Sequence, residues 1–199
     1  AASGVRYANF HTTGLCSPSR AALLTGRNHH TVGTGTVSDL ARGQPGYTTI
    51  IPKSAGTLAH VLKANGYDTA AFGKNHNVPT WQSGPLGPFD QWMSGLGFDY
   101  FYGFHAGYTN QFAPDLIENN SMVEPPRQAD YILDRDMADH AVQWLQTQRV
   151  QGAGKPFLWP SCGKIFGIMD DVIALGINAK HSNEDTIAPY ERWIELYSD

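Results

Sequence analysis

The chain has 199 residues, of which 41% are hydrophobic. This is enough for one sizeable hydrophobic core, but the chain is too short for two domains with a full core each. Its formal net charge of -4 excludes the basic surplus that is typical of proteins that bind nucleic acid or anionic membranes. Two cysteines, Cys16 and Cys162, are too few for a disulfide scaffold, and no CxxC pair indicates structural zinc. We find no signal-peptide pattern and no run long enough to span a membrane, and the compartment stays open.

The first predicted helix covers residues 17–26. Ser17 is its candidate N-cap, Pro18 takes the first helical position, and Gly26 ends it. Cys16 is therefore expected just ahead of a helix N-terminus. A second amphipathic helix is predicted from Thr57 to Gly66.

A buried strand is predicted at residues 69–72, so Lys74 and His76 are expected just beyond a strand end. Residues 78–126 are rich in Gly, Pro and aromatic residues and show little periodicity, which predicts long ordered loops. A helix at 130–148 and a short strand at 156–159 follow. This alternation favours an α/β layered fold over an all-α or all-β one.

Cys16 and Arg20 are the first candidates for chemistry. Backbone N–H groups at a helix start, the helix dipole and a guanidinium one turn on would make an electropositive pocket that holds an oxyanion. The alternative is structural: Cys16 as a small buried hydrophobic residue and Arg20 as an ordinary surface cation.

The flanking residues favour the chemical interpretation. Residues 15–26, Leu-Cys-Ser-Pro-Ser-Arg-Ala-Ala-Leu-Leu-Thr-Gly, resemble the maturation signature of the sulfatase family along their whole length. In that family a separate enzyme oxidises the cysteine to formylglycine, whose hydrated aldehyde supplies one hydroxyl to attack sulfur and a second to expel sulfate. The resemblance implies that Cys16 becomes this nucleophile and that Arg20 supports it. A geminal diol gives the covalent intermediate its own route of collapse.

Residues 73–76, Gly-Lys-Asn-His, resemble the second signature of the family, although Phe72 and Asn75 differ from its commonest residues. By resemblance Lys74 binds the sulfate oxygens, and His76 binds the sulfate or protonates the leaving alcohol. Residues two apart on an extended chain point the same way, so both side chains can face one anion. The structural alternative is a solvated lysine beside a loop histidine.

The likeness covers roughly residues 4–159 and is strongest to the larger bacterial arylsulfatases. It implies an alkaline-phosphatase-like α/β sandwich, of which the chain would hold an incomplete N-terminal portion at residues 1–160, followed by a divergent tail at 161–199. It also implies Ca²⁺, or Mg²⁺, with the formylglycine at Cys16 as one ligand. The other ligands that the family uses, including an Asp-Asp pair upstream of the cysteine, have no counterpart in the chain.

Two further pairs invite a metal-binding interpretation. Adjacent histidines point apart in regular structure, so we interpret His29 and His30 as packing and hydrogen-bonding residues. Asp170 and Asp171 resemble the metal-binding pair in composition but follow the cysteine, and we interpret them as a helix-initiating pair.

The resemblance therefore predicts an arylsulfatase-like hydrolase of sulfate esters, with Cys16, Arg20 and His76 as catalytic residues and Lys74 and His76 as substrate-binding residues. Its partners would be a small anionic sulfate ester and, during maturation, a formylglycine-generating enzyme. Two alternatives stay open: a phosphonate or phosphate ester hydrolase with the same nucleophile, and a catalytically inactive fragment.

Overall fold

The structure is a computed structural model, and it describes residues 9, 11–150, 158–160 and 179–181. The chain divides into two compact units, residues 13–137 and residues 1–12 with 138–199, which we treat separately. We call residues 13–137 the central unit. All four predicted site residues belong to it. The division predicted from the sequence at residue 160 falls where most neighbouring residues lie outside the described part, so it stays a prediction.

The central unit is built around a four-stranded sheet with the order β1-β2-β3-β4. β1 (Ala70–Lys74) and β2 (Tyr100–Phe104) are parallel, while β3 (Leu116–Glu118) and β4 (Ser121–Val123) each run antiparallel to the strand before them. Buried and half-buried residues alternate along β1, as expected for a strand with one face on the core. The mixture of helices with a mixed sheet confirms the α/β prediction.

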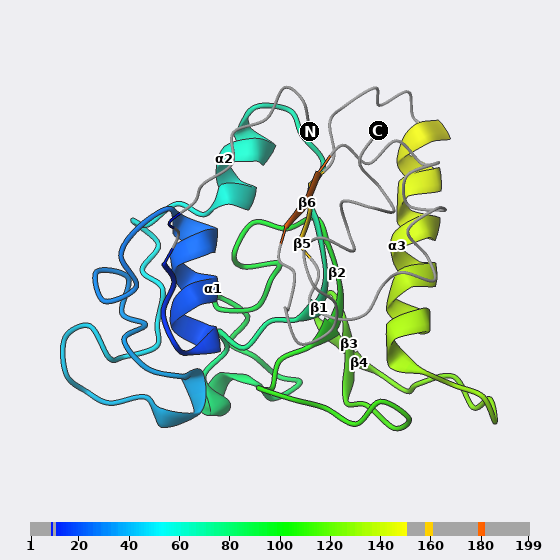
Figure 1. Cartoon of the computed structure of the whole chain (residues 1–199), viewed down its shortest axis with the longest axis horizontal. Coiled ribbons are helices and arrows are strands. Elements are labelled where there is room, and N and C mark those ends of the chain that lie inside the picture. Colours follow the sequence, from blue (N-terminus) through cyan, green and yellow to red (C-terminus); the bar gives the residue numbers. More distant parts are fainter. Residues whose placement is uncertain (1–8, 10, 151–157, 161–178, 182–199) are drawn as a thin grey trace. The chain divides into compact units, whose positions relative to one another are not determined.

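Two helices of the central unit precede β1: α1 (Cys16–Thr25) and α2 (Leu58–Ala64). They contact each other, and Figure 1 shows both on the same side of the four-stranded sheet. Gly26 ends α1 in the left-handed conformation with φ 64°, as predicted, and Thr57 caps α2 through a capping box with His60.

Short 3-10 turns lie in two loops: η1 (Ser38–Leu40) and η2 (Thr80–Gln82). The third helix, α3 (Leu133–Val150), begins in the central unit and continues into the other one, and it confirms the helix predicted at 130–148 with a later start. A separate two-stranded parallel sheet pairs β5 (Leu158–Pro160) with β6 (Ala179–His181). The strand predicted at 156–159 overlaps β5, and its first two residues lie outside the described part.

The prediction of loops throughout residues 78–126 is wrong, because β2, β3 and β4 all lie within it. The strands were missed because all three are short and β2 is rich in aromatic residues. Their hydrogen-bonding partners are distant in sequence or joined by a tight turn at Asn119, which has φ 54°. The apolar residues of this region still pack as a core. Trp92, Phe101 and Leu116 are at most 1% exposed.

Candidate functional site

The candidate site lies where β1 ends and α1 begins. Cys16 is the first residue of α1, and its Sγ lies 2.8 Å from Nδ1 of His76. Sixty residues separate the two in sequence, and the fold brings them into contact. This first turn contains no acidic residue, so its backbone N–H groups and the helix dipole leave the Cys16 end of α1 electropositive.

His76 is reached through a two-residue continuation of the parallel β1–β2 pair. The Asn75 N–H donates to the Phe104 carbonyl at 2.8 Å, and the His76 N–H donates to the His105 carbonyl at 3.0 Å. His76 itself has φ 51°, a left-handed conformation that non-glycine residues rarely adopt. The carboxyl ends of neighbouring parallel strands are the usual place for binding groups in open α/β sheets.

A buried serine joins the two halves of the site. The Ser17 hydroxyl donates to the His76 carbonyl at 2.5 Å and accepts from the Ser38 N–H at 3.1 Å. Ser17 is fully buried, so these bonds are shielded from water. One hydroxyl thereby ties the start of α1, the His76 backbone and η1 together.

The two cations of the site lie on neighbouring elements. Arg20 donates from Nη1 to the Lys74 carbonyl at 2.7 Å, which links α1 to the last residue of β1. Both side chains are half-buried. Because both side chains are positively charged, each of them lowers the pKa of the His76 imidazole.

The imidazole of His76 is buried, with 3% of the residue exposed. Burial is the largest cause that lowers its pKa, and Lys74 and Arg20 lower it further. The hydrogen bond with Asp39, whose Oδ2 lies 3.0 Å from Nε2, opposes this shift without cancelling it. His76 is therefore predominantly neutral near pH 7, and a neutral imidazole has one nitrogen that can accept a proton.

Two details of the predicted geometry are wrong. Cys16 is the first helical residue, with Leu15 as N-cap, and does not stand ahead of a helix capped by Ser17. Ser17 fails as a cap because its hydroxyl is engaged by His76 and Ser38. Lys74 is the last residue of β1, so the strand is longer than predicted. The positive φ of His76 means that Lys74 and His76 do not share one face of an extended chain.

Ser17 and Asp39 were not predicted as site residues. Ser17 was interpreted only as a cap. Asp39 lies in a short 3-10 turn whose sequence carries no motif. Their contacts to His76 span 59 and 37 residues, so no local spacing could have indicated them.

Within residues 9, 11–150, 158–160 and 179–181, no three His, Cys, Asp or Glu side chains are grouped so that they could hold a metal ion. The described residues therefore do not form a calcium cage, which needs about six oxygen ligands. Cys16 and Asp39 bind different nitrogens of the His76 ring, so these three groups do not converge. The Asp170–Asp171 pair lies outside the described residues.

His29 and His30 pack against each other, although the sequence predicted that adjacent side chains point apart, because both residues lie in a turn and not in regular structure. Their rings lie 4.2 Å apart, and Nε2 of His30 lies 3.2 Å from the Tyr47 hydroxyl. His30 thus makes the predicted kind of hydrogen bond, whereas Nδ1 of His29 is buried without a partner. The pair belongs to no metal-binding group of the described chain.

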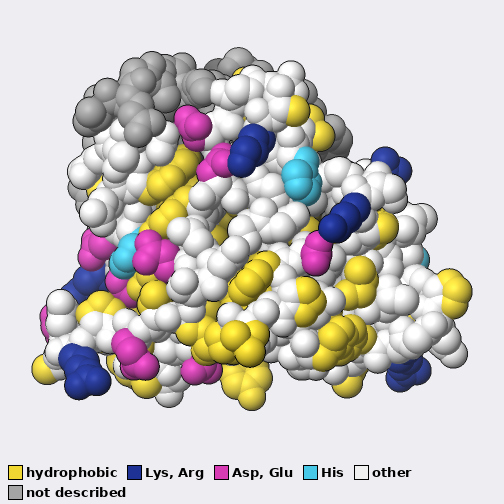
Figure 2. All heavy atoms as spheres, turned by 180° about the vertical axis from the view of Figure 1, so that it is seen from behind, with side chains coloured by type: hydrophobic (Ala, Val, Ile, Leu, Met, Phe, Trp, Pro, Cys, Tyr) yellow, Lys and Arg dark blue, Asp and Glu magenta, His cyan; other side chains and the backbone are white. Residues whose placement is uncertain are grey.

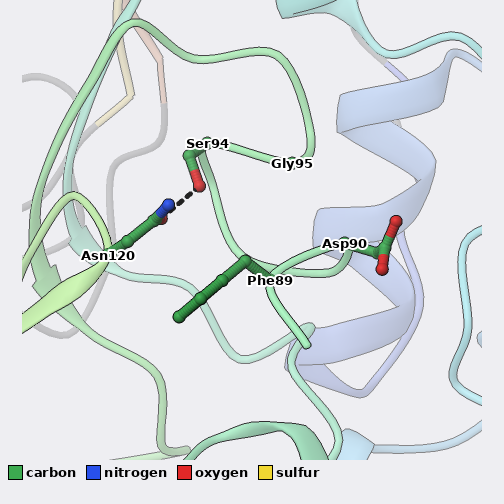
Figure 3. Close-up of a pocket in the computed structure, with 5 residues that line it drawn as sticks. All are labelled: Phe89, Asp90, Ser94, Gly95 and Asn120. Carbon is green, nitrogen blue, oxygen red and sulfur yellow. Dashed lines mark hydrogen bonds between the residues drawn. The ribbon is translucent and has the colours of Figure 1, made fainter. Parts of the chain in front are cut away.

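A shallow pocket of about 360 Å³ lies elsewhere in the central unit. Figure 3 shows the Ser94–Asn120 hydrogen bond on one side of it and the Asp90 side chain pointing away from that pair. Asp90 is engaged by Lys53 at 2.7 Å. None of the four predicted site residues lines this pocket, so it does not contain the candidate site. The lining residues are Phe89, Asp90, Ser94, Gly95 and Asn120.

Solved structures define the class of fold. The crystal structure of Ps i-CgsB matches with 26% identity and a TM-score of 0.53, over 69% of this chain and 32% of that one. The putative sulfatase yidJ from Bacteroides fragilis, 18% identical, matches in fold with a TM-score of 0.52 over 93% of this chain and 37% of that one. The fold is thus the alkaline-phosphatase-like α/β fold of sulfatases, of which the chain has a part.

Sequence comparison then gives the family. The family model described as Sulfatase matches residues 1–159, and the chain belongs to the sulfatase family. It is 30% identical to the uncharacterized sulfatase YdeN of Escherichia coli, over 94% of this chain and 31% of that protein. It is also 30% identical to arylsulfatase G of Canis lupus familiaris, over 79% of this chain and 33% of that protein. The chain therefore spans about a third of the length of these relatives.

The described part of the chain contains no helix that is both long and apolar enough to cross a membrane. Figure 2 shows one face of the molecule, on which the Lys and Arg side chains stand apart from one another rather than in a cluster.

Proposed function

We propose that this chain is the part of a sulfate-ester hydrolase that carries the nucleophile, a formylglycine derived from Cys16. The observation that carries the proposal is the 2.8 Å contact between Cys16 Sγ and His76 Nδ1, between two residues of sulfatase-like signatures. Membership of the sulfatase family supports it. When present, formylglycine supplies one hydroxyl that attacks sulfur and a second that expels sulfate.

His76 would act as the proton carrier. Its neutral ring can accept a proton at Nδ1 from the hydroxyl of residue 16, and it can afterwards donate a proton to the leaving alcohol. The 2.8 Å separation, measured to the cysteine sulfur that the hydroxyl oxygens would replace, lies within hydrogen-bonding reach.

Lys74 and Arg20 would supply positive charge to the sulfate. Negative charge spreads over the sulfate oxygens in the transition state, and preorganised cations and helix N-terminal N–H groups stabilise it most effectively in a site that excludes water. Arg20 also holds the end of β1 against α1 through the Lys74 carbonyl, so it sets the position of its neighbour.

The divalent cation, Ca²⁺ or Mg²⁺, is proposed only from the family resemblance. The described residues do not form a cage for it. None of the steps above uses it. The maturation partner, a formylglycine-generating enzyme, is proposed on the same resemblance.

An aryl sulfate is the substrate that we propose. Three large apolar side chains lie next in sequence to residues that meet at His76: Leu15 beside Cys16, Leu40 beside Asp39, and Tyr108 beside Gly107. They are 48%, 60% and 88% exposed. Exposed apolar side chains carried on the segments that form the site would favour an apolar leaving group over a charged one. Arylsulfatase G is among the relatives of the chain.

The test is turnover of an aryl sulfate by the chain after co-expression with a formylglycine-generating enzyme and addition of calcium. Cys16→Ala is the control, because it removes the nucleophile and little volume. We expect turnover by the parent and none by Cys16→Ala. If both are inactive while mass spectrometry shows residue 16 converted, this chain is not a sulfatase by itself, although its family is unchanged.

A matched aryl phosphate and aryl phosphonate, offered in the same assay, separate the related activities. Sulfate and phosphate esters share a tetrahedral anion, and the phosphate monoester carries one more negative charge. Faster turnover of either phosphorus ester than of the sulfate would contradict the proposed substrate class and favour the alternative hydrolase.

A further inference from the structure

We propose that Asp39 is a positioning residue that holds His76 in the tautomer with its proton on Nε2. The carboxylate Oδ2 lies 3.0 Å from Nε2, and the Cys16 Sγ lies 2.8 Å from Nδ1. The catalytic consequence rests on the proposed function, whereas the tautomer itself does not.

The assignment follows from the donors and acceptors. An ionised carboxylate has no proton to give, so the hydrogen bond with Asp39 requires that Nε2 donates. A neutral imidazole carries one N–H, and Nδ1 is then left with its lone pair facing residue 16. Removing the carboxylate would allow the proton to move to Nδ1, which could then no longer accept one from residue 16.

The backbone around Asp39 is tied to the same site. Ser38, its neighbour, donates its N–H to the Ser17 hydroxyl, and that hydroxyl donates to the His76 carbonyl. Ser17 follows Cys16 in the chain. The neighbours of Cys16 and Asp39 and the backbone of His76 thus meet at one buried hydroxyl, which sets the spacing of the three groups.

Close packing keeps the ring in place. A Cβ added to Gly107 would lie 2.8 Å from Cε1 and 2.9 Å from Nε2 of His76, so the backbone at Gly107 lies against the edge of the ring near Asp39. The ring therefore has little room to turn.

Unconverted Cys16 offers a readout that needs no sulfatase activity. His76 Nδ1 first accepts the thiol proton of Cys16. The resulting thiolate then displaces iodide from iodoacetamide, so that an S–C bond forms and the C–I bond breaks. Loss of the partner that orients a metal-ligating histidine typically lowers activity or metal affinity about 10- to 100-fold, and we expect an effect at the low end of that range for His76. We expect alkylation of the peptide that contains Cys16, followed by mass spectrometry, to slow about 10-fold in Asp39→Ala.

Asp39→Asn and Asp115→Ala complete the set. The Asn carbonyl can still accept from Nε2–H, so Asp39→Asn should keep most of the rate. Asp115→Ala removes another exposed acid that is not in contact with His76 and should match the parent. The Asp39 side chain is 49% exposed, so its removal leaves no large cavity.

Nitrogen-15 NMR of the His76 ring reports the tautomer directly. We expect a protonated Nε2 and an unprotonated Nδ1 in the parent and in Asp39→Asn, and a mixture in Asp39→Ala. A parent spectrum with the proton on Nδ1, or spectra and alkylation rates that are the same in Asp39→Ala and the parent, would overturn the inference. Neither readout involves a sulfate ester, so it can succeed or fail independently of the proposed function.

Discussion

His76 combines a rare backbone conformation with a buried ring. Its φ of 51° costs about 1 kcal/mol or more for a residue with a Cβ, and the hydrogen bonds from its own N–H to His105 and from Ser17 to its carbonyl hold it there. Such conformations persist where the surroundings determine them, and they are common at functional sites. The conformation turns the ring towards Cys16 at the end of β1.

His105 provides a residue-scale test of the packing behind the site. Burial lowers its pKa from 6.5 to about 4, and its Nε2 is buried with no hydrogen-bond partner. The imidazole of His105 binds a proton more tightly in the unfolded chain than in the folded one. The folded state is therefore most stable, with respect to this group, above pH 6.5, and it loses stability as the pH falls towards 4.

The shift in the pKa of His105 corresponds to a loss of about 3 kcal/mol. We expect urea unfolding to show a smaller loss between pH 7 and pH 4.5 in His105→Gln than in the parent. His30→Gln, at an exposed histidine, should keep the full loss. Equal losses in His105→Gln and the parent would contradict this assignment.

Arg20 can be tested for its link between α1 and β1. Arg20→Ala removes the donor to the Lys74 carbonyl, and we expect the free energy of unfolding to fall by about 2 kcal/mol. Turnover of the aryl sulfate should fall about 100-fold, since a fixed donor is lost from the site. Arg27→Ala, at an exposed position just past α1, is the matched control and should change neither quantity. An Arg20→Ala chain with unchanged turnover would remove Arg20 from the site.

Among single residues, the sequence identified Cys16, Arg20, Lys74 and His76, and the structure brings these four together. Resemblance to two signatures carried that prediction, since each signature is continuous in the chain. Asp39 and Ser17 were not identified because their roles come from contacts across 37 and 59 residues.

At the scale of elements, the parallel β1–β2 pair positions the site. Gly73 and Gly103 are opposite each other in this pair, and a Cβ on Gly103 would lie 1.9 Å from the Gly73 carbonyl oxygen. The two strands can therefore approach only because Gly103 has no side chain.

Gly103→Ala tests this close approach. The strands would have to separate, and overpacking of this kind costs about 1–3 kcal/mol or more. We expect a clear fall in the midpoint of thermal unfolding, together with a loss of any activity that depends on His76. Gly84→Ala, where an added Cβ would meet nothing within 4 Å, should unfold like the parent. Similar midpoints for both variants would show that β1 and β2 are not packed as described.

The helices were predicted better than the strands for a physical reason. Helix signals such as Thr57 and Gly26 are local, because caps act within one turn. β2 and β3 depend on partners elsewhere in the chain, and the aromatic residues of β2 resemble those of packed loops. Local sequence could therefore not distinguish a short buried strand from an ordered aromatic loop.

At the scale of the whole molecule, the four predicted site residues, together with Asp39 and Ser17, all belong to the central unit of residues 13–137. The chain spans about a third of the relatives that it resembles, and its described residues form no metal cage. The α/β fold could be predicted from alternating elements, and its alkaline-phosphatase-like class came from the family resemblance.

The most direct test of the central claim is to measure turnover of an aryl sulfate against the fraction of residue 16 that is converted to formylglycine. Samples of the chain with graded conversion would be quantified by mass spectrometry on the peptide that contains residue 16. We predict that the rate rises in proportion to the converted fraction and extrapolates to zero at no conversion. A rate that does not depend on conversion, or no turnover at full conversion, would contradict the account.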